Sequence, residues 1–95
     1  MREERVVDTG LEYMPGDPVL VRVVRRGTRV RVTDDARAAV KAGCAKVPDE
    51  IARAVEDALV VNVSRRGEIF LPAERFVHRI GEASLALYEE LLELE

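Results

Sequence analysis

The chain of 95 residues has little of what most catalytic and ligand sites are built from. It contains one cysteine, one histidine and no tryptophan, and its aromatic residues are two Phe and two Tyr. A single cysteine, Cys44, excludes an internal disulfide. No apolar run approaches the roughly 18 residues that a membrane span requires, and the charged start MREERVVD does not fit a signal peptide. We therefore expect a cytoplasmic protein without cofactors that does not bind a membrane.

Charge is abundant but unevenly distributed along the chain. Residues 1–48 hold ten basic and seven acidic side chains, whereas residues 49–95 hold five basic and eleven acidic ones. The basic excess is concentrated between Arg22 and Arg31, and the acidic excess is heaviest in the final segment EELLELE. We expect such unlike regions to pair within the chain or between two copies of it.

One segment of the sequence occurs twice. Residues 17–27 read DPVLVRVVRRG and residues 57–67 read DALVVNVSRRG. In both, an alternating apolar run reaches Arg-Arg-Gly and a second apolar run follows, which is typical of a β-hairpin. The repeat predicts a single domain, residues 1–95, made of two related units, 17–56 and 57–95. Residues 1–16 are expected to be loosely ordered, with a short extended segment over residues 5–14 as the alternative.

Residue alternation predicts the two faces of the first hairpin, which we place at residues 19–33. An even loop pairs Val23 with Val30 and Arg22 with Arg31, because the side-chain period of a strand is two. One face then holds the valines Val19, Val21, Val23, Val30 and Val32. The other face holds Leu20, Arg22, Val24, Arg29 and Arg31.

Helix signals follow this hairpin. The sequence Thr33-Asp34-Asp35 is typical of a helix N-terminus, and Gly43 of a helix end. The apolar stripe of this helix is expected at Ala36, Ala39 and Val40. A second helix is expected to start at Pro48 and to bury Ile51, Ala54, Val55 and Ala58.

The second unit repeats the pattern with a longer helix. Its hairpin, over residues 59–71, is expected to pair Val63 with Phe70 and Arg65 with Glu68. The helix over residues 73–94 has apolar residues at spacings of three, four and seven, interrupted once by Ser84. The predicted fold is α+β, with two ββα units that form a four-stranded antiparallel sheet and helices mainly on one face.

The basic first hairpin is the strongest candidate for a binding site. Like charges placed opposite each other in a sheet are destabilising, so an anion is expected at this face. The anion could be carboxylates of the chain, a protein partner or a nucleic acid. The hairpin lacks the aromatic residues of single-strand binders, and the net charge is −3, so nucleic acid is not favoured. The candidate anion- or partner-binding residues are Arg22, Arg25, Arg29 and Arg31.

The chain also has more apolar surface than one small domain is expected to cover. A homodimer that buries the second sheet face or the long helix would cover the excess. The residues expected at such an oligomer interface are Leu20, Val60, Ile69, Leu71, Leu87 and Leu91.

No catalytic or metal-binding constellation is visible. Asp34 and Asp35 suit a helix N-terminus, and His78 lies between Glu74 and Glu82 in a helix-surface charge cluster. Cys44 is expected to be a small buried residue. We therefore expect neither an enzyme nor a metal or cofactor site. A pocket in which Asp34, Asp35 and His78 converge would reverse that expectation.

Residues 17–43 resemble a set of small bacterial and phage domains of unknown function. In those domains a hairpin that ends in Thr-Asp-Asp-Gly precedes a helix, a second hairpin and a long C-terminal helix. Here Val32-Thr33-Asp34-Asp35 matches, while Ala36 stands in place of the glycine. The resemblance implies the order of elements and supplies no site residues. The function we expect is a non-enzymatic protein-interaction or regulatory module, homodimeric, and the alternative is nucleic-acid binding through Arg22, Arg29 and Arg31.

Overall fold

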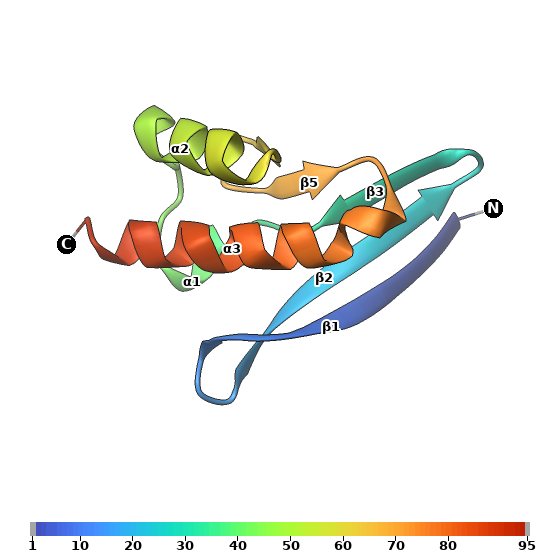
Figure 1. Ribbon diagram of the computed structural model, residues 1–95, viewed down its shortest axis with the longest axis horizontal. Coiled ribbons are helices and arrows are strands. Elements are labelled where there is room, and N and C mark those ends of the chain that lie inside the picture. The colour runs from blue at the N-terminus through green and yellow to red at the C-terminus, as the bar shows by residue number, and fades with distance from the viewer. Residues whose placement is uncertain (1, 95) are drawn as a thin grey trace.

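The computed structural model describes residues 2–94 and contains one antiparallel sheet with the helices packed on one side of it (Figure 1). The strands follow the spatial order β1-β2-β3-β5-β4, with bounds β1 Arg2–Met14, β2 Asp17–Arg26, β3 Arg29–Thr33, β4 Asn62–Val63 and β5 Ile69–Leu71. The helices are α1 Arg37–Lys41, α2 Asp49–Leu59 and α3 Val77–Leu92, and the 3₁₀ turn η1 Glu74–Phe76 leads into α3. The α+β class is confirmed, but the sheet has five strands and not four.

The fifth strand is β1, in a segment expected to be loosely ordered. It is 13 residues long and pairs with β2, for example Arg2 with Arg26 and Val7 with Val21. Its sequence has no clear alternation because residues 2–6 are exposed on both faces of the strand, and charged residues are favoured at such an exposed edge. The pairing is also irregular between Asp8 and Glu12, and Gly10 has a positive φ of 82° in this stretch. This irregularity removes the period-two pattern by which a strand is predicted.

The first hairpin has the predicted faces but a different register. Arg26 pairs with Arg29 and Val23 with Val32, so the loop consists of Gly27 and Thr28. Gly27 has a φ of 60°, which suits the first position of a two-residue hairpin loop. The shift amounts to two residues, so every side chain keeps its face. The expected pairing of Arg22 with Arg31 is wrong, because Arg22 lies opposite Thr33.

The second hairpin differs from its prediction by one residue, which exchanges its faces. Val63 pairs with Ile69 and not with Phe70. The cause is a loop with an odd number of residues. The N–H of Ser64 donates to the carbonyl of Glu68 at 2.9 Å, which leaves three residues in the loop between them. Ile69 therefore points into the core, where it is fully buried, and Phe70 points to the other side.

The two short helices also differ from the expected pattern. Asp35 and Ala36 both have a φ of 58°, a left-handed conformation that delays the start of α1 to Arg37. The helix then buries Ala38 and Ala39 and leaves Val40 72% exposed, so the expected stripe is wrong for Ala36 and Val40. Helix α2 starts after Pro48 as predicted and buries Val55, but Ala54 and Ala58 are exposed and Ile51 is half-buried. Leu59 belongs to α2 and not to a strand.

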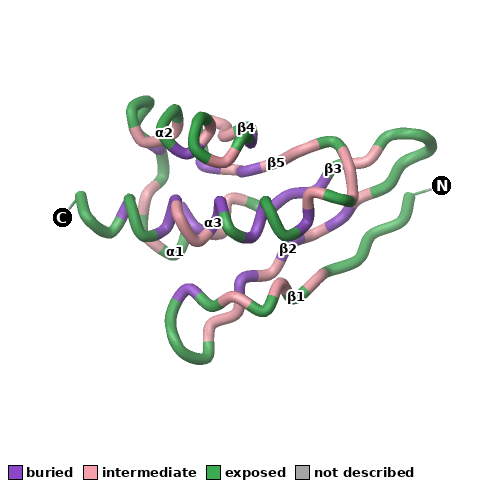
Figure 2. The backbone as a smooth tube through the Cα atoms, in the orientation of Figure 1, coloured by how far each residue is buried: buried purple, intermediate pink, exposed green. Residues whose placement is uncertain are grey.

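Helix α3 lies across the sheet and closes the core. Figure 2 shows the buried parts of β2, β3 and β5 next to the buried side of α3. The predicted stripe is confirmed at Val77, Ile80, Leu87 and Leu91, which are all buried. It is wrong for Leu94, which lies beyond the end of α3 and is 58% exposed. Ser84, which interrupts the stripe, is fully buried as well. No helix within residues 2–94 is long and apolar enough to cross a membrane.

The two Arg-Arg-Gly turns offer a matched test of this packing. A Cβ at Gly67 would lie 2.6 Å from the Cβ of Ala39 and 2.8 Å from Cγ2 of Val47, whereas a Cβ at Gly27 would meet nothing within 4 Å. Both glycines have a positive φ, so both Ala variants are strained. We expect Gly67→Ala to lower the free energy of unfolding by about 2–4 kcal/mol and Gly27→Ala by only about 1 kcal/mol. Urea unfolding followed by circular dichroism measures both, and equal losses would contradict the packing of Gly67.

Candidate functional site

The side of the sheet that faces away from α3 carries the residues of interest, and we call it the open face. Val19, Val21 and Val23 of β2 point into the core, so the alternate side chains point to the opposite side. The register adds neighbours from β1, β3 and β5. Across the strands, the open-face residues form four rows, which are Arg2-Arg26-Arg29, Glu4-Val24-Arg31, Val6-Arg22-Thr33-Phe70 and Asp8-Leu20.

Arg22 is paired with carboxylates of its own chain. Its Nη1 donates to Glu4 Oε1 at 2.6 Å, and its Nε and Nη2 donate to the Asp35 carboxylate at 2.9 Å and 2.7 Å. The hydrogen bonds to Asp35 raise the pKa of Arg22 above its ordinary value, and Glu4 adds to the effect. The guanidinium therefore lies between two acidic groups.

Arg31 is paired as well. Its Nε and Nη2 donate to the two oxygens of Glu68 at 3.1 Å and 2.8 Å, and its guanidinium lies 3.9 Å from the centroid of the Phe70 ring. The hydroxyl of Thr33 also donates to Glu68 at 2.7 Å. Partial burial opposes ionisation of Glu68, but the hydrogen bonds from Arg31 and Thr33 outweigh it and lower its pKa. The Arg31–Glu68 pair is thus held by several contacts.

Arg25 lies on the other side of the sheet from Arg22, Arg29 and Arg31. Together with Arg5 it donates to Glu74 of η1, and these two hydrogen bonds lower the pKa of Glu74. The four candidate arginines therefore do not form one site. Of the three on the open face, Arg29 has no ion-pair partner within the described part of the chain.

Half of the residues expected at an oligomer interface are buried in the hydrophobic core of the chain. Ile69, Leu87 and Leu91 belong to the hydrophobic core and have no surface to offer a partner. Leu71 is half-buried on the helix side of the sheet, opposite Val32. Val60 is 67% exposed, at the end of α2. Only Leu20 is on the open face.

Two apolar residues of the open face were missed by the sequence interpretation. Val6, in β1, is 63% exposed and lies opposite Arg22. Phe70 is brought to this face by the odd loop of the second hairpin. No alternation in residues 2–8 predicts that Val6 lies on a strand face. No local signal predicts the register that turns Phe70 outward.

Asp34 forms a buried hydrogen-bond network behind the open face. Its Oδ1 accepts from the N–H groups of Ala36 and Ile69, each at 2.9 Å, and its Oδ2 accepts from the Ser84 hydroxyl at 2.7 Å. Ser84 is also hydrogen-bonded to the Tyr13 hydroxyl at 2.6 Å. The carboxylate thus stabilises the turn before α1, and the N-cap residue of that helix, Ala36, makes no side-chain cap hydrogen bond.

Burial changes the pKa of both titratable groups in this network. It raises the pKa of Asp34, against the opposing effect of the hydrogen bonds from Ile69, Ser84 and Ala36. It also raises the pKa of Tyr13 to about 12. Asp34 is only 1% exposed, so its role is structural.

The residues considered for catalysis do not come together. Asp34 points inward, Asp35 binds Arg22 on the open face, and His78 is exposed on α3. Cys44 is half-buried, and its Sγ donates to the carbonyl of Lys46 at 3.1 Å. Within residues 2–94 no three His, Cys, Asp or Glu side chains are grouped so that they could hold a metal ion.

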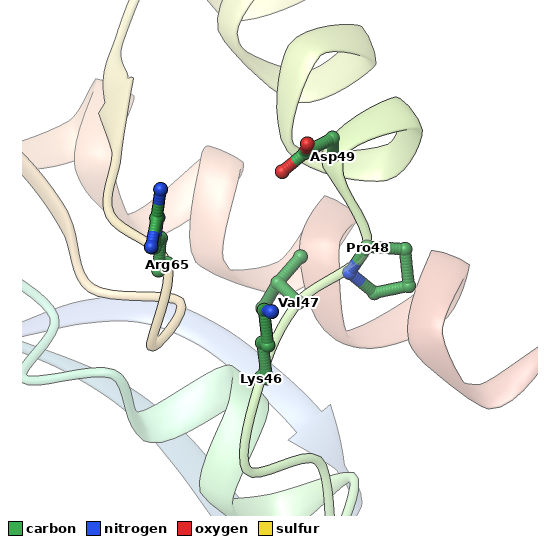
Figure 3. A pocket seen from close by; sticks show the side chains of 5 residues that line it. All are labelled: Lys46, Val47, Pro48, Asp49 and Arg65. Carbon is green, nitrogen blue, oxygen red and sulfur yellow. The ribbon is translucent and has the colours of Figure 1, made fainter.

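Two cavities accompany these features. One of about 430 Å³ is lined by Lys46, Val47, Pro48, Asp49 and Arg65. Figure 3 shows that the Asp49 carboxylate, at the start of α2, faces the space between Lys46 and Arg65. A carboxylate there offsets the two cations and makes the cavity a poor anion site. The other, a depression of about 330 Å³ in the open face, is lined by residues of both charges, which include Arg22, Asp35, Arg66 and Glu68.

The chain was compared with protein-family models, curated proteins and solved structures, and none of them matches it.

The pKa shift of Asp34 predicts an unusual pH dependence of stability. Because the folded-state pKa is raised, the folded chain holds the proton more tightly than the unfolded chain, so stability from this group is lost as pH rises through the folded-state pKa. Asp34→Asn removes this loss but keeps an acceptor for Ala36 and Ile69. We expect the stability of the native chain relative to Asp34→Asn to fall as pH rises above about 4, by at most about 1.4 kcal/mol per pH unit.

Urea unfolding between pH 3.5 and pH 8 measures this difference, at pH values that span the ordinary range of a carboxyl group (about 4). Asp34→Ala serves as the control, because it leaves two buried N–H groups unpaired and is expected to cost about 3 kcal/mol or more at every pH. A stability difference between the native chain and Asp34→Asn that does not vary with pH would contradict the assigned shift.

Proposed function

We propose that the chain is a non-enzymatic, cytoplasmic protein-interaction module and that its open face packs against a second copy to form a homodimer. The observation that carries the proposal is the uncovered sheet surface. The helices pack on the opposite side, and residues 2–14, which were expected to be loosely ordered, extend the sheet as β1. A sheet normally buries one face and is polar on the other, whereas here apolar side chains remain on the second face.

The centre of the open face has the composition of an interface core. Val6, Leu20, Val24 and Phe70 come from three neighbouring rows of the register and from the strands β1, β2 and β5. The paired arginines Arg22 and Arg31 lie among them, with their charges satisfied by carboxylates. An apolar centre with satisfied polar groups around it resembles the core and rim of protein interfaces.

A second copy fits this face better than a polyanion does. Arg22 and Arg31 are already bound to Glu4, Asp35 and Glu68, and these carboxylates would repel phosphate groups on the same surface. The net charge of −3 adds to that repulsion at long range. A face with both signs of charge is suited to self-complementary pairing about a two-fold axis, which is the commonest form of oligomer.

A matched pair of variants tests the location of the interface. Val6 and Val40 are both valines with largely exposed side chains, 63% and 72%, but only Val6 is on the open face. We expect Val6→Glu to raise the dimer dissociation constant by about tenfold or more, because a carboxylate would be desolvated between the sheets. Val40→Glu should leave the constant unchanged. Sedimentation equilibrium measures both, and a native chain that stays monomeric at millimolar concentration would refute the proposal.

A further inference from the structure

Three arginines lie side by side at one end of the open face. Arg2 pairs in register with Arg26, and Arg26 pairs with Arg29, so the three form one row, which we call the arginine row. Directly opposed residues have Cβ atoms about 5 Å apart, and like charges at this spacing are destabilising. Arg2 is bound to Glu4 at 2.6 Å. Within residues 2–94, Arg26 and Arg29 have no ion-pair partner.

The other end of the same face is acidic. Asp8 lies opposite Leu20 in the last row. Asp35 lies two residues beyond the end of β3, where its carboxylate is bound to Arg22 while the side chain stays 39% exposed and open to a second guanidinium. Leu20 and Arg26 are six residues apart on β2, which corresponds to about 20 Å along an extended strand. The two ends are therefore too far apart to neutralise each other within one copy, and we call Asp8 and Asp35 the acidic end.

We propose that two copies pack with their open faces together and their strands antiparallel, so that the arginine row of each copy lies over the acidic end of the other. This inference rests on the proposed homodimer and adds its orientation and its specific contacts. A two-fold axis perpendicular to the strands exchanges the two ends of the face. It also keeps the apolar rows of Val6 and Val24 at the centre.

The opposite orientation is disfavoured by the same charges. If the strands of the two copies ran parallel, each arginine row would face the other copy's arginine row, and six guanidinium groups would be brought together. Stacked sheets are about 10 Å apart, a distance that long arginine side chains can bridge to a carboxylate. The aligned packing of sheets within about 30° of each other is compatible with these contacts.

The distribution of charge favours this partner over a nucleic acid. A phosphate backbone could bind the arginine row, but it would then cross Glu4, Asp8 and Asp35 on the same face, and their carboxylates would repel it. The aromatic residue of this face, Phe70, is already stacked by Arg31 and is not free to stack with a base. A second copy supplies carboxylates for the arginines and arginines for the carboxylates.

A double-mutant cycle on the dissociation constant of the full chain tests the proposed contacts. One variant is Arg26→Gln with Arg29→Gln, the second is Asp8→Asn with Asp35→Asn, and the third combines all four changes. Asparagine keeps the acceptor that Asp8 offers to the N–H of Gly10 and tolerates the left-handed backbone of residue 35. The matched control is Arg53→Gln with Arg79→Gln, two exposed arginines of α2 and α3 that lie away from the open face.

We expect each double variant to raise the dissociation constant about tenfold and the quadruple variant to raise it little further, because the same contacts are lost in each. The control should leave it unchanged. Two outcomes would overturn the orientation while leaving the homodimer intact. In one, the quadruple variant raises the dissociation constant by the product of the two separate effects. In the other, the dimer forms but neither double variant changes its dissociation constant. Salt-sensitive binding of a DNA or RNA oligonucleotide that Arg26→Gln with Arg29→Gln abolishes would assign the row to phosphate and overturn the inference. A native chain that does not dimerise would refute the proposed function itself.

Discussion

The hydrogen bonds of the buried Asp34 carboxylate hold the fold together. They join the turn after β3 to the backbone of β5 and to Ser84 of α3, and Ser84 connects them to Tyr13 of β1. A buried carboxylate is costly unless hydrogen bonds compensate it, so these segments must meet in one arrangement. The network sets β5 beside β3 and places α3 over one side of the sheet.

This arrangement leaves the open face for another role. Because α3 and the two shorter helices lie on one side, no helix of the described chain covers the other side of the sheet. At the centre of this face, Arg22 and Arg31 form ion pairs with carboxylates. Next to the β2–β3 loop, Arg26 and Arg29 have no ion-pair partner within residues 2–94. The asymmetry between the two repeated turns fits this division, because Gly67 packs against Ala39 and Val47 whereas Gly27 lies in an exposed loop.

The parts of the structure that sequence patterns predicted are those in which one regular element buries one face. Alternating Val and Arg in β2 and β3 gave the correct faces, and the spacing of Val77, Ile80 and Leu87 gave α3. The failures have physical causes. The edge strand β1 lacks alternation, and the three-residue loop of the second hairpin turns Phe70 outward. Asp34 looks like a helix cap, although two of its partners are 35 and 50 residues away. Ser84 in an apolar stripe was the visible sign of that buried network.

Contacts between copies are the most direct test of the central claim that the open face is a homodimer interface. Isotope-filtered NMR on a mixture of labelled and unlabelled chains detects only contacts that cross from one copy to the other. The proposed dimer predicts such contacts among the methyl groups of Val6, Leu20 and Val24 and none from Val40. Cross-chain contacts confined to the helix side, or their absence at millimolar concentration, would contradict it.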